Sequence, residues 1–415
     1  MWDRFFRKSI WSFSSISAKT ICILVINKIF AVFWGTTGIT LLAHFQNLLA
    51  LVTHIPNDGI NRGVVKFWAN KKIPFSLKLD LFFTGFVLNG LIFGVSIIVF
   101  LLFHRQIFSI FLVDIEGPLF IGVFIVIVFL NLGYLFFSSI ILSFNRIKSY
   151  TILNIASNIF SVAGVIYGAI MRNFDFALLA YGLGMGINII FTTIILFRLG
   201  FTGFPKFRIT WKSIHRLSEF IVLASSVLIF GKLVDFLIRL YAIQELGFHR
   251  TGLWQAIVRI SEAYMFIFIG TLGMVYRPNI QKYIFDYEKL SNYVKYILKI
   301  SIPFTIAGLV ITYFLRNPIL SILFSPQFIQ ASRLMPFQLI GDFFGIIAYL
   351  LAYVLAAQSR IRDFILLQAM AAISFVILTM VFINFLGVDG LPIAYAIKNA
   401  FFFILVLSFN RRLIF

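Results

Sequence analysis

The sequence predicts an all-α integral membrane protein with twelve transmembrane helices, and composition gives the first reason. Of the 415 residues, 61% are hydrophobic and only 12% are charged, with a mean hydropathy of +0.99. A soluble domain is closer to half apolar and a quarter charged. Long apolar segments recur along the whole chain. The loops between them are alternately rich and poor in basic residues, which indicates an even number of spans.

The first half of the chain contains six apolar segments long enough to cross a bilayer, which requires about 20 residues. They cover residues 12–33, 37–56, 79–103, 118–143, 150–170 and 175–197. The second segment is the most polar of the six, because it contains His44, Gln46, Asn47, Thr53 and His54. The other five are predicted as ordinary spans.

The second half repeats this arrangement with segments at 217–240, 252–275, 294–315, 334–356, 364–385 and 390–409. The longest loop, residues 198–216, separates the two sets and contains glycine, proline and five basic residues. This composition is typical of a linker. The sequence therefore predicts an N-terminal lobe of six helices at 1–200, a cytoplasmic linker at 201–216 and a C-terminal lobe at 217–415.

Basic residues outside the predicted spans fall mainly on one side. The N-terminus and the even-numbered loops, counted with the C-terminus, hold 22 Lys and Arg, whereas the odd-numbered loops hold five: Arg105, Arg172, Arg250, Arg316 and Arg333. Cytoplasmic loops carry this excess in membrane proteins, so both termini are expected in the cytoplasm. The same bias accounts for most of the net charge of +20, and nucleic acid is not an expected partner.

Motifs for catalysis or cofactor binding are absent from the sequence. It contains no glycine-rich phosphate loop, no HExxH and no GxSxG. The single cysteine, Cys22, excludes an internal disulfide and a multi-cysteine metal site. We therefore expect neither an enzyme nor a resident cofactor or metal.

Charged residues inside the predicted spans are the main functional signal. A charge at the centre of a membrane helix costs about 2.5–3.5 kcal/mol on insertion scales and usually marks a site. Span seven carries Lys232, Asp235 and Arg239, and span eight carries Arg259 and Glu262. Spacings of three and four residues place such partners on one helix face, which predicts a ladder and a pair.

Basic residues outnumber acidic ones at bilayer depth. Eight lie near or inside spans: Lys19, Lys28, Lys232, Arg239, Arg259, Lys295, Lys299 and Lys398. Asp342 in span ten has no cation three or four positions away, so its partner must come from another helix or from water. One interpretation is that the charges pair and hold helices together. The other, which explains the excess, is a hydrated cavity between the lobes with a basic wall.

A short internal repeat connects the two halves. The stretch "INKIFAVFWGTTGI" (26–39) resembles "IRLYAIQELGFHRTGL" (238–253), with Lys28 matching Arg239 and Gly38 matching Gly252. Repeated bundles with a site near the midplane are typical of transporters that work by alternating access.

Three segments also resemble a known family. They are "ISAKTICILVINKIFAVFWGTTGITLLAHFQNLLAL" (16–51), "TGLWQAIVRISEAYMFIF" (251–268) and "PFQLIGDFFGIIAYLLAYVLAAQSRIRDFI" (336–365). They look like the Wzx-type flippases of undecaprenyl-diphosphate-linked oligosaccharides, within the MOP (MATE-like) exporter superfamily. The resemblance implies two six-helix bundles around a central cavity.

The charge excess in the spans and the resemblance together suggest roles for the membrane charges, and the resemblance by position covers Lys19, Lys28, Arg239, Glu262 and Asp342. Lys19, Lys28, Lys232, Arg239 and Arg259 are expected to bind the diphosphate of the substrate. Asp235, Glu262 and Asp342 are expected to couple transport to H⁺ or Na⁺ or to gate it. Arg259 departs from the family pattern, and Glu262 stands where a relative has aspartate. The carried glycan, O-antigen or enterobacterial common antigen, stays open; the polymerase and chain-length regulator of the same pathway are expected partners.

Two other functions stay open. A multidrug exporter of the same fold would be cation-coupled and should have an acidic or neutral cavity. A polytopic polysaccharide polymerase usually carries a large periplasmic loop, whereas the longest odd-numbered loop here spans about 18 residues, 316–333.

Overall fold

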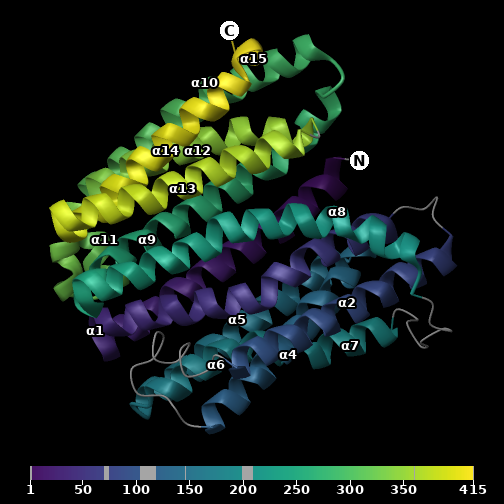
Figure 1. The fold of residues 1–415 in the computed structure, drawn as a ribbon, viewed down its shortest axis with the longest axis horizontal. Helices are drawn as coiled ribbons and strands as arrows, with labels where there is room; N and C mark the ends of the chain where they lie inside the picture. The colour runs from purple at the N-terminus through teal and green to yellow at the C-terminus, as the bar shows by residue number, and fades with distance from the viewer. Residues whose placement is uncertain are drawn as a thin grey trace. The chain divides into compact units, whose positions relative to one another are not determined.

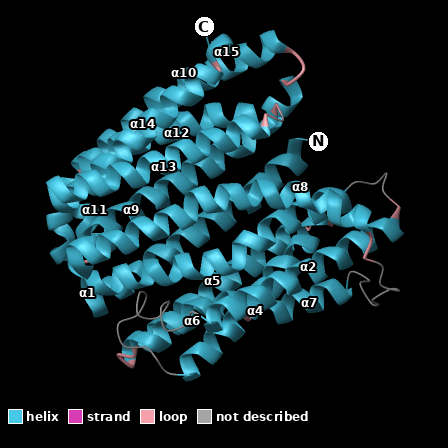
Figure 2. Cartoon of the chain, in the orientation of Figure 1, coloured by secondary structure: helices cyan, strands magenta, loops and turns pink. Residues whose placement is uncertain are grey.

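The fold is described from a computed structural model, for residues 2–69, 74–102, 118–144, 146–198, 209–358 and 360–414. All regular structure in these ranges is helical (Figures 1 and 2). The chain divides into two compact units. Unit 1 comprises Met1–Ile29 and Leu41–Leu233, and unit 2 comprises Phe30–Thr40 and Val234–Phe415.

Unit 1 is built from most of the long first helix and seven elements that follow it. They are α1 (Trp2–Ala69), α2 (Phe75–Leu102), α4 (Pro118–Ser143), α5 (Ile147–Ile170), α6 (Phe174–Gly186), α7 (Ile189–Arg198), α8 (Trp211–Leu228) and the π-helical turn η1 (Ile229–Leu233). Glycines set several close approaches. A Cβ on Gly184 would lie 2.5 Å from the Cα of Ser161, so only a small residue lets α6 pack this tightly on α5.

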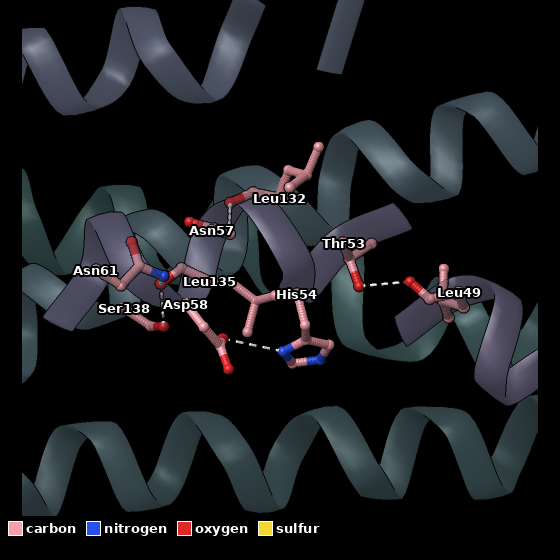
Figure 3. Close-up of polar contacts among 9 residues, drawn as sticks. All are labelled: Leu49, Thr53, His54, Asn57, Asp58, Asn61, Leu132, Leu135 and Ser138. Carbon is pink, nitrogen blue, oxygen red and sulfur yellow. Dashed lines mark hydrogen bonds and ion pairs between the residues drawn. The ribbon is translucent and has the colours of Figure 1, made fainter. Parts of the chain in front are cut away.

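Polar side chains of α1 at and just beyond the end of the second predicted span make contacts within unit 1. Asn57 and Asn61 on α1 donate their amides to the backbone carbonyls of Leu132 and Leu135 on α4, each at 3.2 Å (Figure 3). On the neighbouring face of α1, His54 Nδ1 lies 3.1 Å from the Asp58 carboxylate. Hydrogen bonds between helices satisfy polar groups that would otherwise have no partner in the hydrocarbon core of the bilayer.

Unit 2 contains nine elements besides residues 30–40. They are α9 (Val234–Tyr283), α10 (Tyr287–Phe314), α11 (Arg316–Leu323), η2 (Pro326–Leu334), α12 (Met335–Ala357), α13 (Ile361–Leu386), η3 (Gly387–Asp389), α14 (Gly390–Phe409) and α15 (Arg411–Ile414). Helices α12 and α14 lie side by side (Figure 1). The most apolar part of the candidate span Pro326–Ala357, which joins η2 and α12, is 61% buried, whereas that of α10 is 17% buried, so α10 is the more peripheral of the two.

The described residues contain nine helices or helix pairs long and apolar enough to cross a membrane. Three of these, Ser14–His54, Ile229–Gly270 and Arg362–Phe409, have 41, 42 and 48 residues. At 1.5 Å per residue each is about 60 Å or longer, twice a hydrocarbon core. Each is interrupted by a glycine with positive φ: Gly35, Gly247 or Gly387. Counted as pairs, they are consistent with the twelve predicted spans of a multi-pass membrane protein.

The repeated segments meet inside unit 2. The kink at Gly35 and the kink at Gly247 are matched parts of the internal repeat, and residues 30–40 pack on the second kink. Thr36 Oγ1 and His249 Nδ1 share a hydrogen bond of 2.8 Å, and the Thr40 hydroxyl donates to the carbonyl of Phe248 at 3.0 Å. The predicted lobes at 1–200 and 217–415 stay a prediction. In this structure α8 belongs to unit 1, and residues 201–208 of the predicted linker lie outside the described ranges.

Candidate functional site: a buried carboxylate with three hydroxyl donors

The most tightly organised polar site in unit 2 surrounds Asp342 on α12, whose exposed fraction is 0%. The Ser261 hydroxyl donates to Asp342 Oδ2 at 2.7 Å, and the Tyr264 hydroxyl donates to the same oxygen. The Tyr395 hydroxyl donates to Oδ1 at 2.9 Å, while Gln338 Nε2 stands at 3.5 Å from that oxygen. The expectation that the partner of Asp342 comes from another helix is confirmed: α9 and α14 supply the three hydroxyls.

Gly341 makes room for this arrangement. A Cβ on Gly341 would lie 2.5 Å from the ring of Tyr395 and 3.1 Å from the Cα of Ala396. The missing side chain therefore lets α14 approach α12 closely enough for the Tyr395 hydroxyl to reach the neighbouring carboxylate. The Gly-Asp pair acts as one structural unit, with the glycine admitting the helix and the aspartate receiving its hydrogen bond.

The "SEAY" stretch at 261–264 contributes differently from what the sequence suggested. Ser261 and Tyr264, three residues apart on α9, face Asp342 together. Glu262 lies about 100° around the helix from Ser261. Its carboxylate accepts from Arg259 Nη1 at 2.7 Å, with side chains 42% and 10% exposed for Glu262 and Arg259. The predicted Arg259–Glu262 pair is confirmed.

Arg239 has a neutral partner that the sequence did not reveal. Its side chain is 4% exposed, and its Nε donates to Oε1 of Gln255, which is fully buried on the other side of the Gly247 kink. Gln255 orients the guanidinium without neutralising it. Asp235, the acid of the predicted ladder with Lys232 and Arg239, is half-buried at the start of α9, one turn before Arg239 on the same helix. The ladder stays a prediction.

Lys398 is a residue whose place in the site was missed. Its ammonium donates to Asn399 Oδ1 at 2.9 Å and lies 4.8 Å from the ring centroid of Tyr395 and 5.0 Å from that of Phe375. The sequence placed Lys398 in the last span but gave no reason to connect it with Asp342. Tyr395 makes that connection, because its hydroxyl binds the carboxylate and its ring receives the cation.

The remaining candidates lie in unit 1. Lys19 is exposed on α1, Lys28 is half-buried further along the same helix, and Lys232 is half-buried in η1. The basic set is thus divided, with Lys19, Lys28 and Lys232 in unit 1 and Arg239 and Arg259 in unit 2. A π-helical turn is often found at functional sites. The cationic wall stays a prediction.

The arrangement around Asp342 presents a buried carboxylate and three hydroxyl oxygens to one another. An ionised carboxylate has about four acceptor positions, enough for its three hydroxyl donors. Hydroxyl and carboxylate oxygens also suit hard cations. Among the described residues no group of three or more His, Cys, Asp or Glu side chains is placed to hold a metal ion.

Comparison with solved structures defines the class of fold. The chain matches an inward-facing multidrug resistance MATE family transporter of the MOP superfamily with a TM-score of 0.79, at 14% identity and 97% coverage of both chains. It matches the lipid II flippase MurJ with a TM-score of 0.75, at 14% identity, covering 97% of this chain and 87% of MurJ. The chain therefore has a MATE-like fold.

Two curated proteins are similar over nearly the whole sequence. They are the lipid III flippases of Escherichia coli (strain K12) and Shigella flexneri, each 22% identical over 386 residues, which cover 92% of this chain and 91% of the relative. No protein-family model matches the chain. These relatives and neighbours are flippases and transporters, not catalytic enzymes.

Proposed function

We propose that the protein flips undecaprenyl-diphosphate-linked oligosaccharides from the cytoplasmic to the periplasmic leaflet by alternating access. The similarity to lipid III flippases over 92% of the chain and the MATE fold support this function. The observation that carries it is a buried arginine at membrane depth, Arg239, oriented by the neutral side chain of Gln255. A cation oriented in this way can attract an anionic headgroup.

The diphosphate must lose much of its hydration to cross, and unpaired charge in an apolar medium is very unfavourable. Charge-assisted hydrogen bonds from basic side chains offset that loss. The wall that provides them consists of Lys19, Lys28, Lys232, Arg239 and Arg259. The sugars travel in the hydrated cavity with the diphosphate, while the lipid chain stays in hydrocarbon.

Acidic residues couple this cycle to an ion. Asp342 binds H⁺ or Na⁺ among the hydroxyls of Ser261, Tyr264 and Tyr395. Binding of the ion changes which hydrogen bonds the carboxylate accepts, and so changes how α9 and α14 are held on α12. Glu262 is half-exposed and can exchange Arg259 for another partner, which suits gating; Asp235 modulates the charge at the start of α9.

The protein works in the bacterial inner membrane with both termini in the cytoplasm. This orientation follows from the distribution of basic loop residues. The polymerase and chain-length regulator of the same polysaccharide pathway are the expected protein partners, because the flipped repeat unit is their substrate.

Arg239→Ala in a strain that depends on this protein tests the proposal. We expect surface polysaccharide to be lost while the loaded carrier accumulates on the cytoplasmic side. Arg250→Ala is the matched control, since Arg250 is exposed on the same helix. Normal polysaccharide in the Arg239→Ala strain, at equal protein levels, would contradict the proposal.

Drug export is the second candidate, because the first structural neighbour above is a multidrug resistance transporter. Cells expressing the protein should then lose accumulated lipophilic dye faster than cells without it. Dye efflux with no effect on polysaccharide would favour this alternative; polysaccharide restoration with no dye efflux favours the flippase.

A further inference from the structure

An apolar groove of about 650 Å³ lies within unit 2, between α9, α10 and α12. Its walls include Tyr264 and Phe268 from α9, Phe304, Thr305 and Gly308 from α10, and Ile346 from α12. The rings of Phe268 and Phe304 stack across it with centroids 6.0 Å apart. A volume of this size is in the range of pockets that hold a ligand.

The groove lies at bilayer depth and opens on a lipid-exposed helix. Every lining residue falls in one of the candidate spans Ile229–Gly270, Tyr287–Phe314 and Pro326–Ala357. Phe304 is 69% exposed and Ile300 is 51% exposed, so the α10 side of the groove is in contact with the surroundings of the protein. No lining residue carries a formal charge at neutral pH. The complementary ligand is therefore a hydrocarbon chain and not a headgroup.

We infer that this groove binds the polyprenyl chain of the lipid-linked oligosaccharide during transport. The inference rests on the proposed function, which requires the chain to stay in hydrocarbon while the headgroup moves. A polyprenyl chain has a methyl branch in each isoprene unit and is wider than a straight acyl chain. Gly308 provides width, because a Cβ built there meets nothing within 4 Å.

Contact with the carboxylate site distinguishes this groove from a general lipid-facing surface. The side chain of Tyr264 lines the groove, while its hydroxyl donates to Asp342. A chain lying against the Tyr264 ring thus touches a residue that orders the candidate ion site. Binding of the lipid chain and the hydrogen bonding of Asp342 are therefore coupled through the side chain of Tyr264. A surface that only contacts bulk lipid would not need this coupling.

Two hydroxyls on α10 provide a test of the ligand's polarity. Thr312 donates to the carbonyl of Gly308 at 2.8 Å, whereas the Thr305 hydroxyl is buried without a hydrogen-bond partner among the described residues. A polar ligand group would use the Thr305 hydroxyl, and a hydrocarbon chain would not. Thr305→Val keeps the shape of the wall and removes the hydroxyl, so it should leave chain binding intact.

The experiment uses the full-length protein in nanodiscs of phosphatidylethanolamine and phosphatidylglycerol. The probe is a polyprenyl monophosphate with a diazirine in its chain, and labelled positions are mapped by mass spectrometry. We expect labels on the groove residues of α10, competed by unlabelled polyprenyl phosphate but not by excess phosphatidylethanolamine. Gly308→Phe should lower this labelling at least about tenfold, because the ring fills space that the chain needs.

Three variants control for folding and for polarity. Gly308→Ala should label like the wild type, since its methyl group has room. Val310→Phe adds a ring on the same helix at an exposed residue outside the groove and should also label normally. Thr305→Val should label at least as strongly as the wild type.

Several outcomes would overturn the inference. They are labelling spread evenly over the exposed apolar face, equal competition by phosphatidylethanolamine, unchanged labelling of Gly308→Phe, or loss of labelling in Thr305→Val. The readout needs no sugar and no transport, so it separates the two proposals. Specific labelling without flipping in cells would leave the groove assignment standing and refute the proposed function. If Gly308→Phe changes neither flipping nor labelling, the assignment of the groove to the polyprenyl chain is refuted and the proposed function is not.

Discussion

Replacement of Tyr395 by phenylalanine measures the charge state of Asp342 in the folded protein. The change removes one hydroxyl that donates to Oδ1 at 2.9 Å and keeps the ring that lies beside Lys398. A hydrogen bond to a neutral group contributes about 0.5–1.5 kcal/mol to stability, and one to a charged group about 1.5–3 kcal/mol. A large loss on Tyr395→Phe therefore indicates an ionised Asp342, and a small loss indicates a protonated one.

The assay is reversible unfolding in mixed detergent micelles, run as a double-mutant cycle with Asp342→Asn. We expect a coupling energy between Tyr395 and Asp342 of at least about 0.5 kcal/mol in either charge state. Tyr296→Phe is the control: Tyr296 is 60% exposed on α10, so its hydroxyl should matter by less than about 0.5 kcal/mol. A coupling energy indistinguishable from zero would refute the assignment of Tyr395 as a partner of the carboxylate.

Two further predictions concern α9. Gly252→Ala should destabilise the protein by about 1–3 kcal/mol in the same assay, because its Cβ would lie 2.2 Å from the carbonyl oxygen of Thr36. Gly308→Ala is the control and should be neutral or stabilising, because a Cβ there has open space. Equal effects of the two substitutions on stability would contradict this packing. Gln255→Glu should preserve folding but reduce polysaccharide flipping, because a carboxylate at this position neutralises Arg239. Gln255→Met removes the orienting oxygen without adding charge, so it should impair flipping less. A greater loss of flipping in Gln255→Met than in Gln255→Glu would count against a role for the charge of Arg239.

Much of the framework could be predicted because hydrocarbon imposes simple rules on a sequence. The length of the apolar segments predicted the spans, and the three very long helices are interrupted near the predicted loops at Gly35, Gly247 and Gly387. The pairing of Arg259 with Glu262 followed from helix geometry alone, since residues three apart share a face. These predictions depend only on local spacing.

The carboxylate site could be predicted only in part because it depends on packing between distant helices. Ser261 and Tyr264 are parts of a motif, but the charge in that motif is on Glu262, which lies between them. Helix rotation places Glu262 on a different face, and nothing local indicates which face meets α12. Tyr395 was missed because its selection depends on how closely α14 approaches Gly341, a tertiary distance that one sequence does not encode visibly.

In unit 2, neutral side chains orient two charged groups, Asp342 and Arg239, without neutralising them. Asp342 receives its three short hydrogen bonds from neutral hydroxyls, and Gln255 orients Arg239 through a neutral carbonyl. A structural ion pair would place an opposite charge at these positions, as Arg259 and Glu262 do at the next face of α9. The hydroxyl donors of Asp342 carry no charge, so they orient its carboxylate without neutralising it. The same carboxylate accepts from Tyr264, which also lines the apolar groove, so the candidate ion site and the groove share one side chain.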